Sequence, residues 1–230
     1  MGPLATCAFY REIILATRAT RDQEHLHVIV DSESAIPDRT AFLLEEGPDP
    51  RPALIASACR LVEAGCELLA MPCNTAHAFA GDIRAAVSVP LLDWVGISAE
   101  AMALEAPARA MVGVLATRGT LRVGLHQVAL SHLGLVPVLP TDDEAGGIMD
   151  AVYGSGGVKG GTVHPENQRR LIEVARLLVG RGASRLLLGC TELPLAVAPE
   201  DVRWPAPTFD PAVANARAVV LLAGGQLSSV

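Results

Sequence analysis

The chain has 230 residues, of which 50% are hydrophobic and 19% are charged, and its formal net charge is −7. This length is comfortable for two lobes of about 100 residues each, and the composition is that of a globular protein with a substantial core. The acidic balance argues against a nucleic-acid partner and an anionic membrane surface, and every apolar run is shorter than the roughly 20 residues of a membrane span.

The cysteines indicate a reducing compartment. There are five of them, and the N-terminal sequence MGPLATCAFYRE lacks the basic region and apolar core of a secretory signal. An odd number without a signal predicts free thiols in a cytoplasmic protein rather than a disulfide framework. No CxxC or HExxH spacing occurs, so we expect no zinc site.

Apolar strand-like runs alternate with helix-like segments along most of the chain. Strands are predicted at 25–30, 67–71, 89–92, 110–116, 135–139 and 185–188. Helices are predicted to begin near Pro3, Arg51, Ala76, Ile97, Thr120, Thr141, Pro165 and Pro211. Strands separated by helices of this length favour an α/β fold with mostly parallel sheets that are covered on both faces.

Two strand–helix junctions look like the same unit built twice. ELLAMPCNTAH (67–77) and SRLLLGCTELPL (184–195) each run from an apolar strand into a polar turn with a cysteine. Cys73 lies 71 residues after Gly2, and Cys190 lies 71 residues after Gly119. We therefore predict two similar α/β lobes, residues 1–95 with 210–230 and residues 96–209, with the last helix packed on the first lobe.

The repeat also predicts a difference between the lobes. The second lobe begins with the strand MVGVLATRGT, whereas the first begins directly at MGPLAT. The equivalent leading strand is missing from this sequence, so we expect neighbouring parallel strands in the first lobe to lack a partner.

Both repeated cysteines are expected between the C-terminal end of a strand and the start of a helix. Ligands bind there in open α/β sheets, and the amide groups and helix dipole favour thiolates and carboxylates. This twin setting makes Cys73 and Cys190 candidate catalytic residues. Cys7, Cys59 and Cys66 instead fit the usual reading of inert small hydrophobes.

Three charged residues are candidates for the same site. Arg39, in the motif IPDRT, would follow a strand and suit a carboxylate, against the weaker alternative of a loop arginine in a surface ion pair. Lys159 is the single lysine among 18 basic residues. We interpret its glycine-rich segment YGSGGVKGG as a mobile loop that brings an ammonium to a ligand, against the alternative of a solvated lysine. Glu192 either assists the thiol or only favours a helix start.

Short polar side chains complete the set. The polar side chains next to the two cysteines could donate hydrogen bonds to a ligand. The threonine at the end of a strand could bind a ligand or equally be an ordinary turn residue. These side chains are Asn74, Thr75 and Thr191 beside the sulfurs, and Thr117 at the end of the strand 110–116.

Six motifs in order carry a resemblance to a known family. MGPLAT, IPDRT, PCNTAH, VGVLAT, VKGG and GCTEL, spread from residue 1 to about 195, together resemble the cofactor-independent aspartate/glutamate racemase superfamily, with aspartate racemase as the nearest branch. The resemblance implies pseudo-twofold lobes with the active site between them, a small acidic amino acid as substrate, and a homodimer. It also implies that one cysteine thiolate removes the α-proton and the opposite thiol returns a proton to the other face.

The resemblance extends to the ligand-binding residues. Arg39 and Lys159 match positions that hold the side-chain carboxylate of aspartate. Other matches, near the α-carboxylate and ammonium, are Asn74, Thr75, Thr117 and Thr191. Family members carry a strand and a glycine-rich turn ahead of MGPLAT, so Met1 and Gly2 are expected at the first wall of the substrate pocket.

Several alternatives remain open at this point. A maleate isomerase or a hydantoin racemase also uses two cysteines, but the Arg39/Lys159 pair favours an acidic amino acid, and two thiols argue against a single-cysteine decarboxylase. A catalytically inactive homologue that binds an acidic ligand is a further reading. A pyridoxal-phosphate racemase would have Lys159 as its only candidate Schiff-base lysine. A thiol redox protein is disfavoured because Cys73 and Cys190 lie far apart in sequence.

Overall fold

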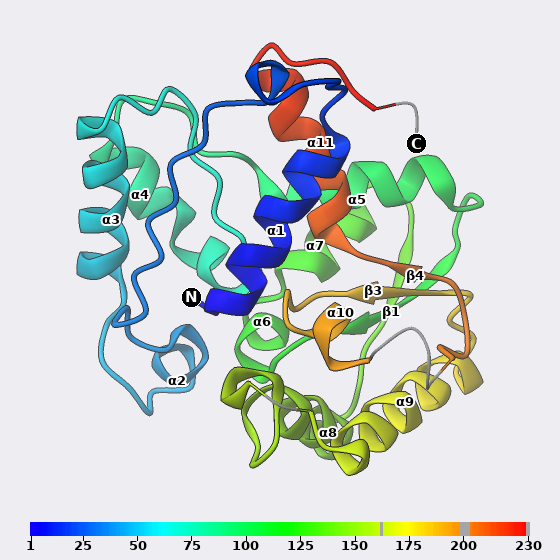
Figure 1. The fold of residues 1–230 in the computed structure, drawn as a ribbon. Helices are drawn as coiled ribbons and strands as arrows, with labels where there is room; N and C mark the ends of the chain where they lie inside the picture. Colours follow the sequence, from blue (N-terminus) through cyan, green and yellow to red (C-terminus); the bar gives the residue numbers. More distant parts are fainter. Residues whose placement is uncertain (162, 198–202, 229–230) are drawn as a thin grey trace.

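The computed structural model describes residues 1–161, 163–197 and 203–228. A parallel sheet lies between two layers of helices, and a mainly helical N-terminal region packs beside it (Figure 1). The helices are α1 (Pro3–Ala16), α2 (Arg39–Leu43), α3 (Arg51–Glu63), α4 (Ala80–Ala86), α5 (Trp94–Glu105), α6 (Arg118–Val123), α7 (Leu125–His132), α8 (Asp142–Tyr153), α9 (Pro165–Gly180), α10 (Leu193–Ala196) and α11 (Pro211–Leu222), with short 3-10 turns η1 (Asp22–Glu24), η2 (Thr75–Phe79) and η3 (Val158–Gly160).

The sheet has four parallel strands in the order β2-β1-β3-β4. They are β1 (Met111–Leu115), β2 (Val136–Val138), β3 (Arg185–Leu188) and β4 (Thr208–Phe209). The register places Leu115 opposite Leu188. Because parallel strands end at the same edge, the segments that follow β1 and β3 emerge side by side, and these segments carry Thr117 and Cys190.

Alternate residues of the central strands point to opposite layers. Leu115, Leu186 and Leu188 pack with the apolar faces of α8 and α9. Val114 and Leu187 pack instead with α5 and α7. This alternation explains the uninterrupted apolar runs in the sequence, and it confirms the prediction of an α/β fold with a parallel sheet covered on both faces.

The strands predicted in the N-terminal region are largely wrong. Residues 25–30 form no strand, and 67–71 and 89–92 contribute the isolated parallel bridge between Leu69 and Leu91. An apolar run becomes a strand where a neighbouring backbone satisfies its N–H and C=O groups. Within the described chain, residues 26–30 make no such backbone contact. The segment that contains Leu69 and Met71 is held instead by packing of these side chains against α3 and α4.

Most predicted helix starts are confirmed. Helices begin at Pro3, Arg51, Pro165 and Pro211, and Thr141 caps α8 with a reciprocal bond to Glu144. The start near Ile97 is three residues late, because the side chain of Asp93 accepts from the Gly96 amide and begins α5 at Trp94. The start near Thr120 is two residues late, and Ala76 lies in η2 rather than in an α-helix.

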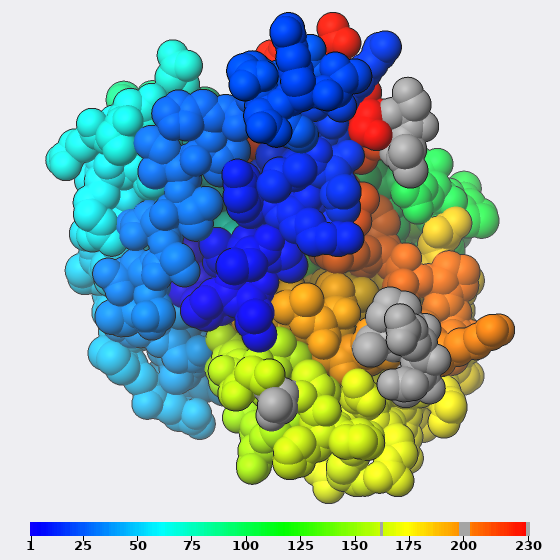
Figure 2. Space-filling model, viewed as in Figure 1, coloured from blue at the N-terminus to red at the C-terminus, as the bar shows by residue number. Residues whose placement is uncertain are grey.

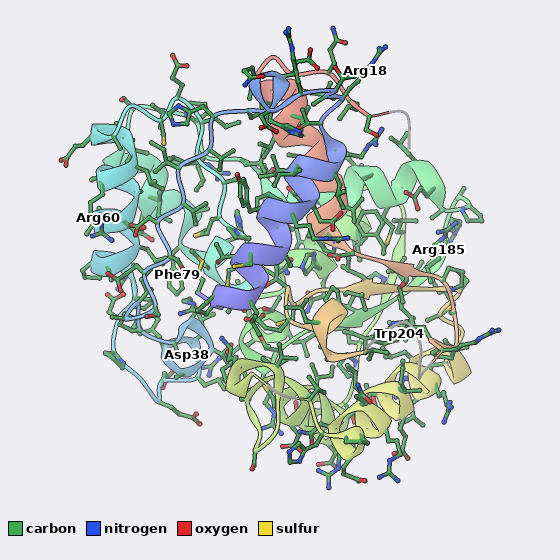
Figure 3. The ribbon with its side chains drawn as sticks, in the orientation of Figure 1. Arg18, Asp38, Arg60, Phe79, Arg185 and Trp204 are labelled. Atoms are coloured by element: carbon green, nitrogen blue, oxygen red, sulfur yellow. The ribbon has the colours of Figure 1, made fainter. Side chains whose placement is uncertain are left out.

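The last helix lies across the junction of the chain's two halves. It packs along α1 and also along α5 (Figure 1). Figure 2 shows α1 at the surface, with the rest of the N-terminal region to its left and the region of α8 below it. In Figure 3, Phe79 lies inside the N-terminal region and Arg60 at its periphery. The lobe boundaries themselves stay a prediction. Of the described helices, none combines the length and apolarity that a membrane span requires.

Candidate active site

The two cysteine turns meet in the folded chain. Thr191 Oγ1 donates a hydrogen bond to the backbone oxygen of Pro72 at 3.4 Å, although these residues are 119 positions apart. Pro72 precedes Cys73, and Thr191 follows Cys190. Cys190 is 7% exposed, whereas Cys73 is half-buried. The structure therefore brings the two repeated units together at their cysteines, and we call the group formed by Arg39, Cys73, Lys159, Cys190 and Glu192 the two-cysteine site.

Two glycines allow this close approach. A Cβ atom at Gly119 would lie 2.8 Å from Thr40 Cα, and one at Gly2 would lie 2.5 Å from Glu192 Oε1. Both distances are too short for a Cβ atom. At Gly119 the obstacle is the backbone of Thr40, so only glycine fits there, whereas at Gly2 it is the end of the flexible Glu192 side chain. These are the two glycines that stand 71 residues before the cysteines, and each lies against the opposite half of the chain.

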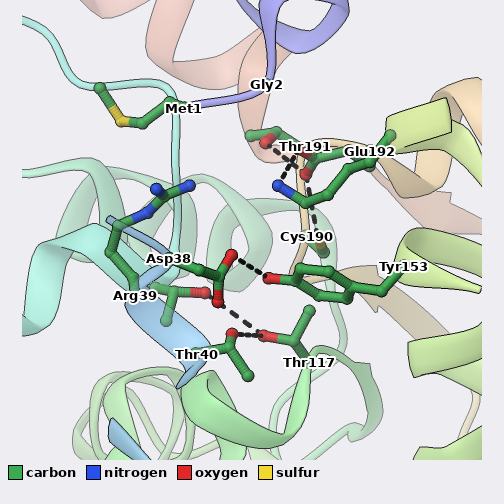
Figure 4. A network of polar contacts seen from close by, with 12 residues as sticks. Met1, Gly2, Asp38, Arg39, Thr40, Thr117, Tyr153, Cys190, Thr191 and Glu192 are labelled. Carbon is green, nitrogen blue, oxygen red and sulfur yellow. Dashed lines mark hydrogen bonds and ion pairs between the residues drawn. The ribbon is translucent and has the colours of Figure 1, made fainter. Parts of the chain in front are cut away.

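The surroundings of Cys190 are acidic. Its Sγ donates to Glu192 Oε2 at 3.1 Å, and Thr191 Oγ1 approaches the same oxygen at 3.1 Å (Figure 4). Lys159 Nζ lies 3.5 Å from the other oxygen of Glu192. Burial, and then the Glu192 charge, raise the pKa of Cys190 well above its ordinary value. At neutral pH this cysteine is accordingly a thiol.

The surroundings of Cys73 are basic. Arg39 is 5% exposed and its Nη1 donates to the backbone oxygens of Ile36 and Pro37 at 3.2 and 2.9 Å. Burial acts to lower the pKa of Arg39, but the neighbouring Cys73, Asp38 and Tyr153 outweigh burial and the pKa is raised. Arg39 Nε is buried and finds no partner in the described chain. A buried guanidinium donor left unpaired here suits an anionic ligand.

Met1 lies on the same side as Arg39 (Figure 4). Its backbone nitrogen donates to the oxygen of Glu33 at 3.4 Å. The chain at Gly2 runs close to Glu192, since an added Cβ there would lie 2.5 Å from Glu192 Oε1, and the wall role of Met1 and Gly2 stays a prediction.

A cluster of threonines joins the two halves beside the cysteines. Thr75 Oγ1 lies 2.7 Å from Thr120 Oγ1 and 3.3 Å from Thr117 Oγ1. Thr40 Oγ1 is also 3.3 Å from Thr117 Oγ1 (Figure 4). The sequence analysis singled out Thr75 and Thr117 but not Thr40 and Thr120, although these end the segments IPDRT and MVGVLATRGT, because nothing local shows that their hydroxyls meet.

Two further residues at the site were missed. Tyr153 Oη donates to Asp38 Oδ2 at 3.0 Å and so links α8 to α2 (Figure 4). Lys159 Nζ lies 4.9 Å from the centre of the Tyr153 ring, a cation–π distance. Burial raises the pKa of Tyr153, which keeps its hydroxyl protonated. The motifs IPDRT and YGSGGVKGG contain both residues, and Asp38 is recognisable as a helix N-cap, but nothing local pairs them.

The amide oxygen of Asn74 is held by protein groups outside the two-cysteine site. Its Oδ1 accepts hydrogen bonds from two buried rings, those of Trp94 and His126. In the described part of the chain, no group of three or more His, Cys, Asp or Glu side chains is placed to hold a metal ion.

A family model described as Asp/Glu/Hydantoin racemase matches residues 1–219. The chain belongs to the Asp/Glu/Hydantoin racemase family. The resemblance seen in the motifs is thereby confirmed at the level of the family.

Two relatives in this family share about a third of their residues with the matched segments. The broad specificity amino-acid racemase RacX of Bacillus subtilis is 30% identical over 141 residues, which cover 58% of this chain and 59% of that protein. The glutamate racemase of Corynebacterium glutamicum is 31% identical over 158 residues, which cover 65% of this chain and 54% of that protein. The chain thus spans little more than half of either relative.

Solved racemase-family structures share the whole fold. An aspartate racemase from Picrophilus torridus superposes with a TM-score of 0.80 at 24% identity, covering 99% of this chain and 92% of that one. An aspartate racemase homologue from Pyrococcus horikoshii gives 0.71 at 26% identity, covering 96% and 95%. The racemase-family fold therefore extends over nearly the full chain, while the roles of its site residues stay predictions.

Proposed function

We propose that this chain is a cofactor-independent racemase that interconverts L- and D-aspartate, or the closely related glutamate, with Cys73 and Cys190 as its two bases. The observation that carries the proposal is the contact between Thr191 and Pro72, which joins the two cysteine turns with Arg39 and Lys159 nearby. Membership of a family whose relatives are named aspartate and glutamate racemases supports it.

The unlike charges around the thiols favour one resting state. Glu192 accepts the S–H of Cys190 and holds it as the acid. Arg39 supplies a positive charge beside the sulfur of Cys73, and we assign Cys73 as the base on this placement. The sequence left open which cysteine begins protonated, and the electrostatics of the site support Cys190.

The proposed reaction is a transfer of one proton on each face of the α-carbon. The Cys73 thiolate takes the α-proton and becomes a thiol, while the Cys190 thiol gives its proton to the opposite face and becomes a thiolate. One C–H and one S–H bond break, and one of each forms. The negative charge moves from Cys73 to Cys190, and the opposite enantiomer restores it by the reverse path.

Substrate binding follows from the donors that remain available. Arg39 Nε has no hydrogen-bond partner among the described residues, and the Lys159 ammonium has donors beyond the one that faces Glu192, so the two can bind the side-chain carboxylate. We assign Thr75, Thr117, Thr191 and Asn74 to the α-carboxylate and ammonium, and Met1 and Gly2 to the wall. This assignment favours a short acidic amino acid over an uncharged hydantoin.

Isotope exchange tests the proposal directly. The protein is incubated with L-aspartate in D2O, and loss of the α-proton signal is followed by NMR together with chiral analysis. We expect exchange and the appearance of D-aspartate, and we expect Cys73→Ser or Cys190→Ser to abolish interconversion. Cys7→Ser is the matched control, because Cys7 is exposed on α1, and it should retain activity.

The other readings become outcomes of the same test. Binding of aspartate and glutamate without exchange would identify an inactive ligand-binding homologue and refute the enzyme. Turnover of maleate or a hydantoin in place of an acidic amino acid would refute the substrate. A homodimer and a cytoplasmic location remain expectations from the resemblance, and sedimentation velocity tests the first of them.

A further inference from the structure

The orientation of the Asn74 amide is determined by two buried rings. Asn74 is 2% exposed, and its Oδ1 lies 3.0 Å from Trp94 Nε1 and 2.9 Å from His126 Nε2. An indole N–H can only donate, so the amide atom facing Trp94 must be the oxygen. The amide nitrogen then faces away from both rings.

The same contact determines the state of His126. Because Oδ1 is an acceptor, His126 Nε2 must carry a hydrogen. Burial lowers the pKa of His126 to about 4, so the ring is neutral at pH 7 and its proton is on Nε2. Two neutral N–H donors therefore hold one amide oxygen.

The amide nitrogen of Asn74 is left without a partner. Nδ2 is buried and makes no hydrogen bond to the part of the chain that the structure describes. An unmade hydrogen bond at a buried donor is costly, and buried donors are almost always satisfied. Asn74 is the residue next to Cys73, so an oxygen of a ligand bound at the two-cysteine site can supply the missing acceptor.

The two rings are well placed to hold the amide rigidly. Trp94 is fully buried and packs against Phe9 with ring centres 5.0 Å apart and against His77 at 6.3 Å. His126 is 1% exposed, and a Cβ atom at Gly189 would lie 3.3 Å from its Cδ2. His126 thus hydrogen-bonds Asn74 beside one cysteine and lies near Gly189 beside the other.

We propose that Trp94 and His126 are positioning residues that hold the Asn74 amide with its N–H donors available to a carboxylate oxygen of the substrate. The proposal rests on the proposed function and adds two residues that act through Asn74 rather than on the substrate. Since either donor alone still holds the oxygen, removing one should have a small effect and removing both should release the amide.

A set of variants measures this coupling through kcat and KM for aspartate. Trp94→Phe and His126→Leu each remove one donor, and Asn74→Ala removes the amide. We expect each single donor variant to raise KM a few-fold, and the double variant to approach Asn74→Ala, at roughly tenfold or more. His126→Gln, which returns an N–H donor, should restore KM toward the wild-type value.

The Asn74→Ala background separates positioning from packing. There we expect His126→Leu to change KM no further, because the amide it positions is gone. An equal rise of KM in both backgrounds, or an unchanged KM in Asn74→Ala itself, would overturn the proposal. Thermal unfolding of each variant shows whether it is folded, and the His126 variants carry the test if Trp94→Phe fails to fold.

Calorimetric titration with L-aspartate gives the same cycle a second readout. Binding without α-proton exchange would refute the racemase and leave the positioning proposal to be judged on Kd. Equal Kd in the wild type and Asn74→Ala would refute the positioning proposal alone. A folded wild type that binds neither aspartate nor glutamate would overturn both.

Discussion

At the scale of single residues, the two thiols differ in the sign of their nearest charge. Cys73 has Arg39 beside it, whereas Cys190 donates its S–H to a buried carboxylate. A buried carboxylate next to a buried thiol opposes loss of the thiol proton. The pair is thus symmetric in sequence and asymmetric in electrostatics.

Glu192→Gln should make Cys190 easier to ionise. The substitution keeps the shape of the side chain and removes the negative charge that raises the pKa of Cys190. We expect the thiolate absorbance of Cys190 to appear at lower pH than in the wild type. Subtracting the ultraviolet titration of the matching Cys190→Ser variant identifies the signal. An unchanged midpoint would mean that burial alone sets this pKa.

Lys159→Gln should weaken substrate binding. It removes an ammonium that sits between Glu192 and the Tyr153 ring. A hydrogen bond to a charged group contributes about 1.5–3 kcal/mol, so KM for aspartate should rise roughly tenfold or more. Steady-state kinetics measure this, with Lys159→Arg as the charge-preserving control. A normal KM in the Gln variant would assign Lys159 to holding Glu192 only.

The residues that bear motifs could be predicted from the sequence, and their partners could not. Cys73 and Cys190 are marked by the repeat, and Lys159 is marked as the sole lysine. Tyr153 and His126 become visible only in three dimensions, because each is defined by a contact with a distant residue, Asp38 or Asn74. A single sequence gives no signal for such pairs.

At the scale of elements, the approach of α2 to α6 depends on one missing side chain. Gly119 lies in α6 with its Cα facing Thr40 of α2. These helices also carry Arg39 and adjoin Thr117, so their spacing sets the geometry of the site.

Gly119→Ala should therefore destabilise the protein even though alanine favours helices. The new Cβ would lie 2.8 Å from Thr40 Cα, and overpacking of this kind costs about 1–3 kcal/mol. Gly180→Ala in α9 is the matched control, because no described atom outside its own stretch of chain lies within 4 Å of its added Cβ. That change should be neutral or stabilising. Calorimetry would contradict the argument if both variants had the same Tm.

Element prediction succeeded where the partners of an element are local in the sequence. Pro165 and the capping box of Thr141 with Glu144 mark helix starts through contacts within a few residues. The strand predicted at 25–30 failed because a strand needs a distant backbone partner, which an apolar run does not reveal. The order β2-β1-β3-β4 likewise depends on long-range pairing.

At the scale of the whole molecule, two buried histidines limit stability in acid. Burial lowers the pKa of His77 and of His126 to about 4, against about 6.5 for an unfolded histidine. Folding therefore excludes two protons that the unfolded chain would bind. The stability present above pH 6.5 is lost as the pH falls toward about 4.

His126→Gln should make this loss shallower. With one titrating ring removed, the unfolding free energy should depend less steeply on pH between 6.5 and 4. Urea unfolding at several pH values measures the slope. His132→Gln, the same substitution at an exposed position, is measured alongside as the control. Equal slopes in the wild type and His126→Gln would contradict this, because they would mean that the folded and unfolded proteins bind a proton at this ring equally well.

The unequal surroundings of Cys73 and Cys190 have a thermodynamic consequence under the proposed function. Mirror-image amino acids have equal free energies in water, so kcat/KM must be the same in the two directions. Any difference in kcat between the two enantiomers that arises from the unlike charges of Arg39 and Glu192 must then be matched by an equal ratio of their KM values. This charge difference decides which enantiomer saturates the protein at the lower concentration, while the final mixture stays racemic.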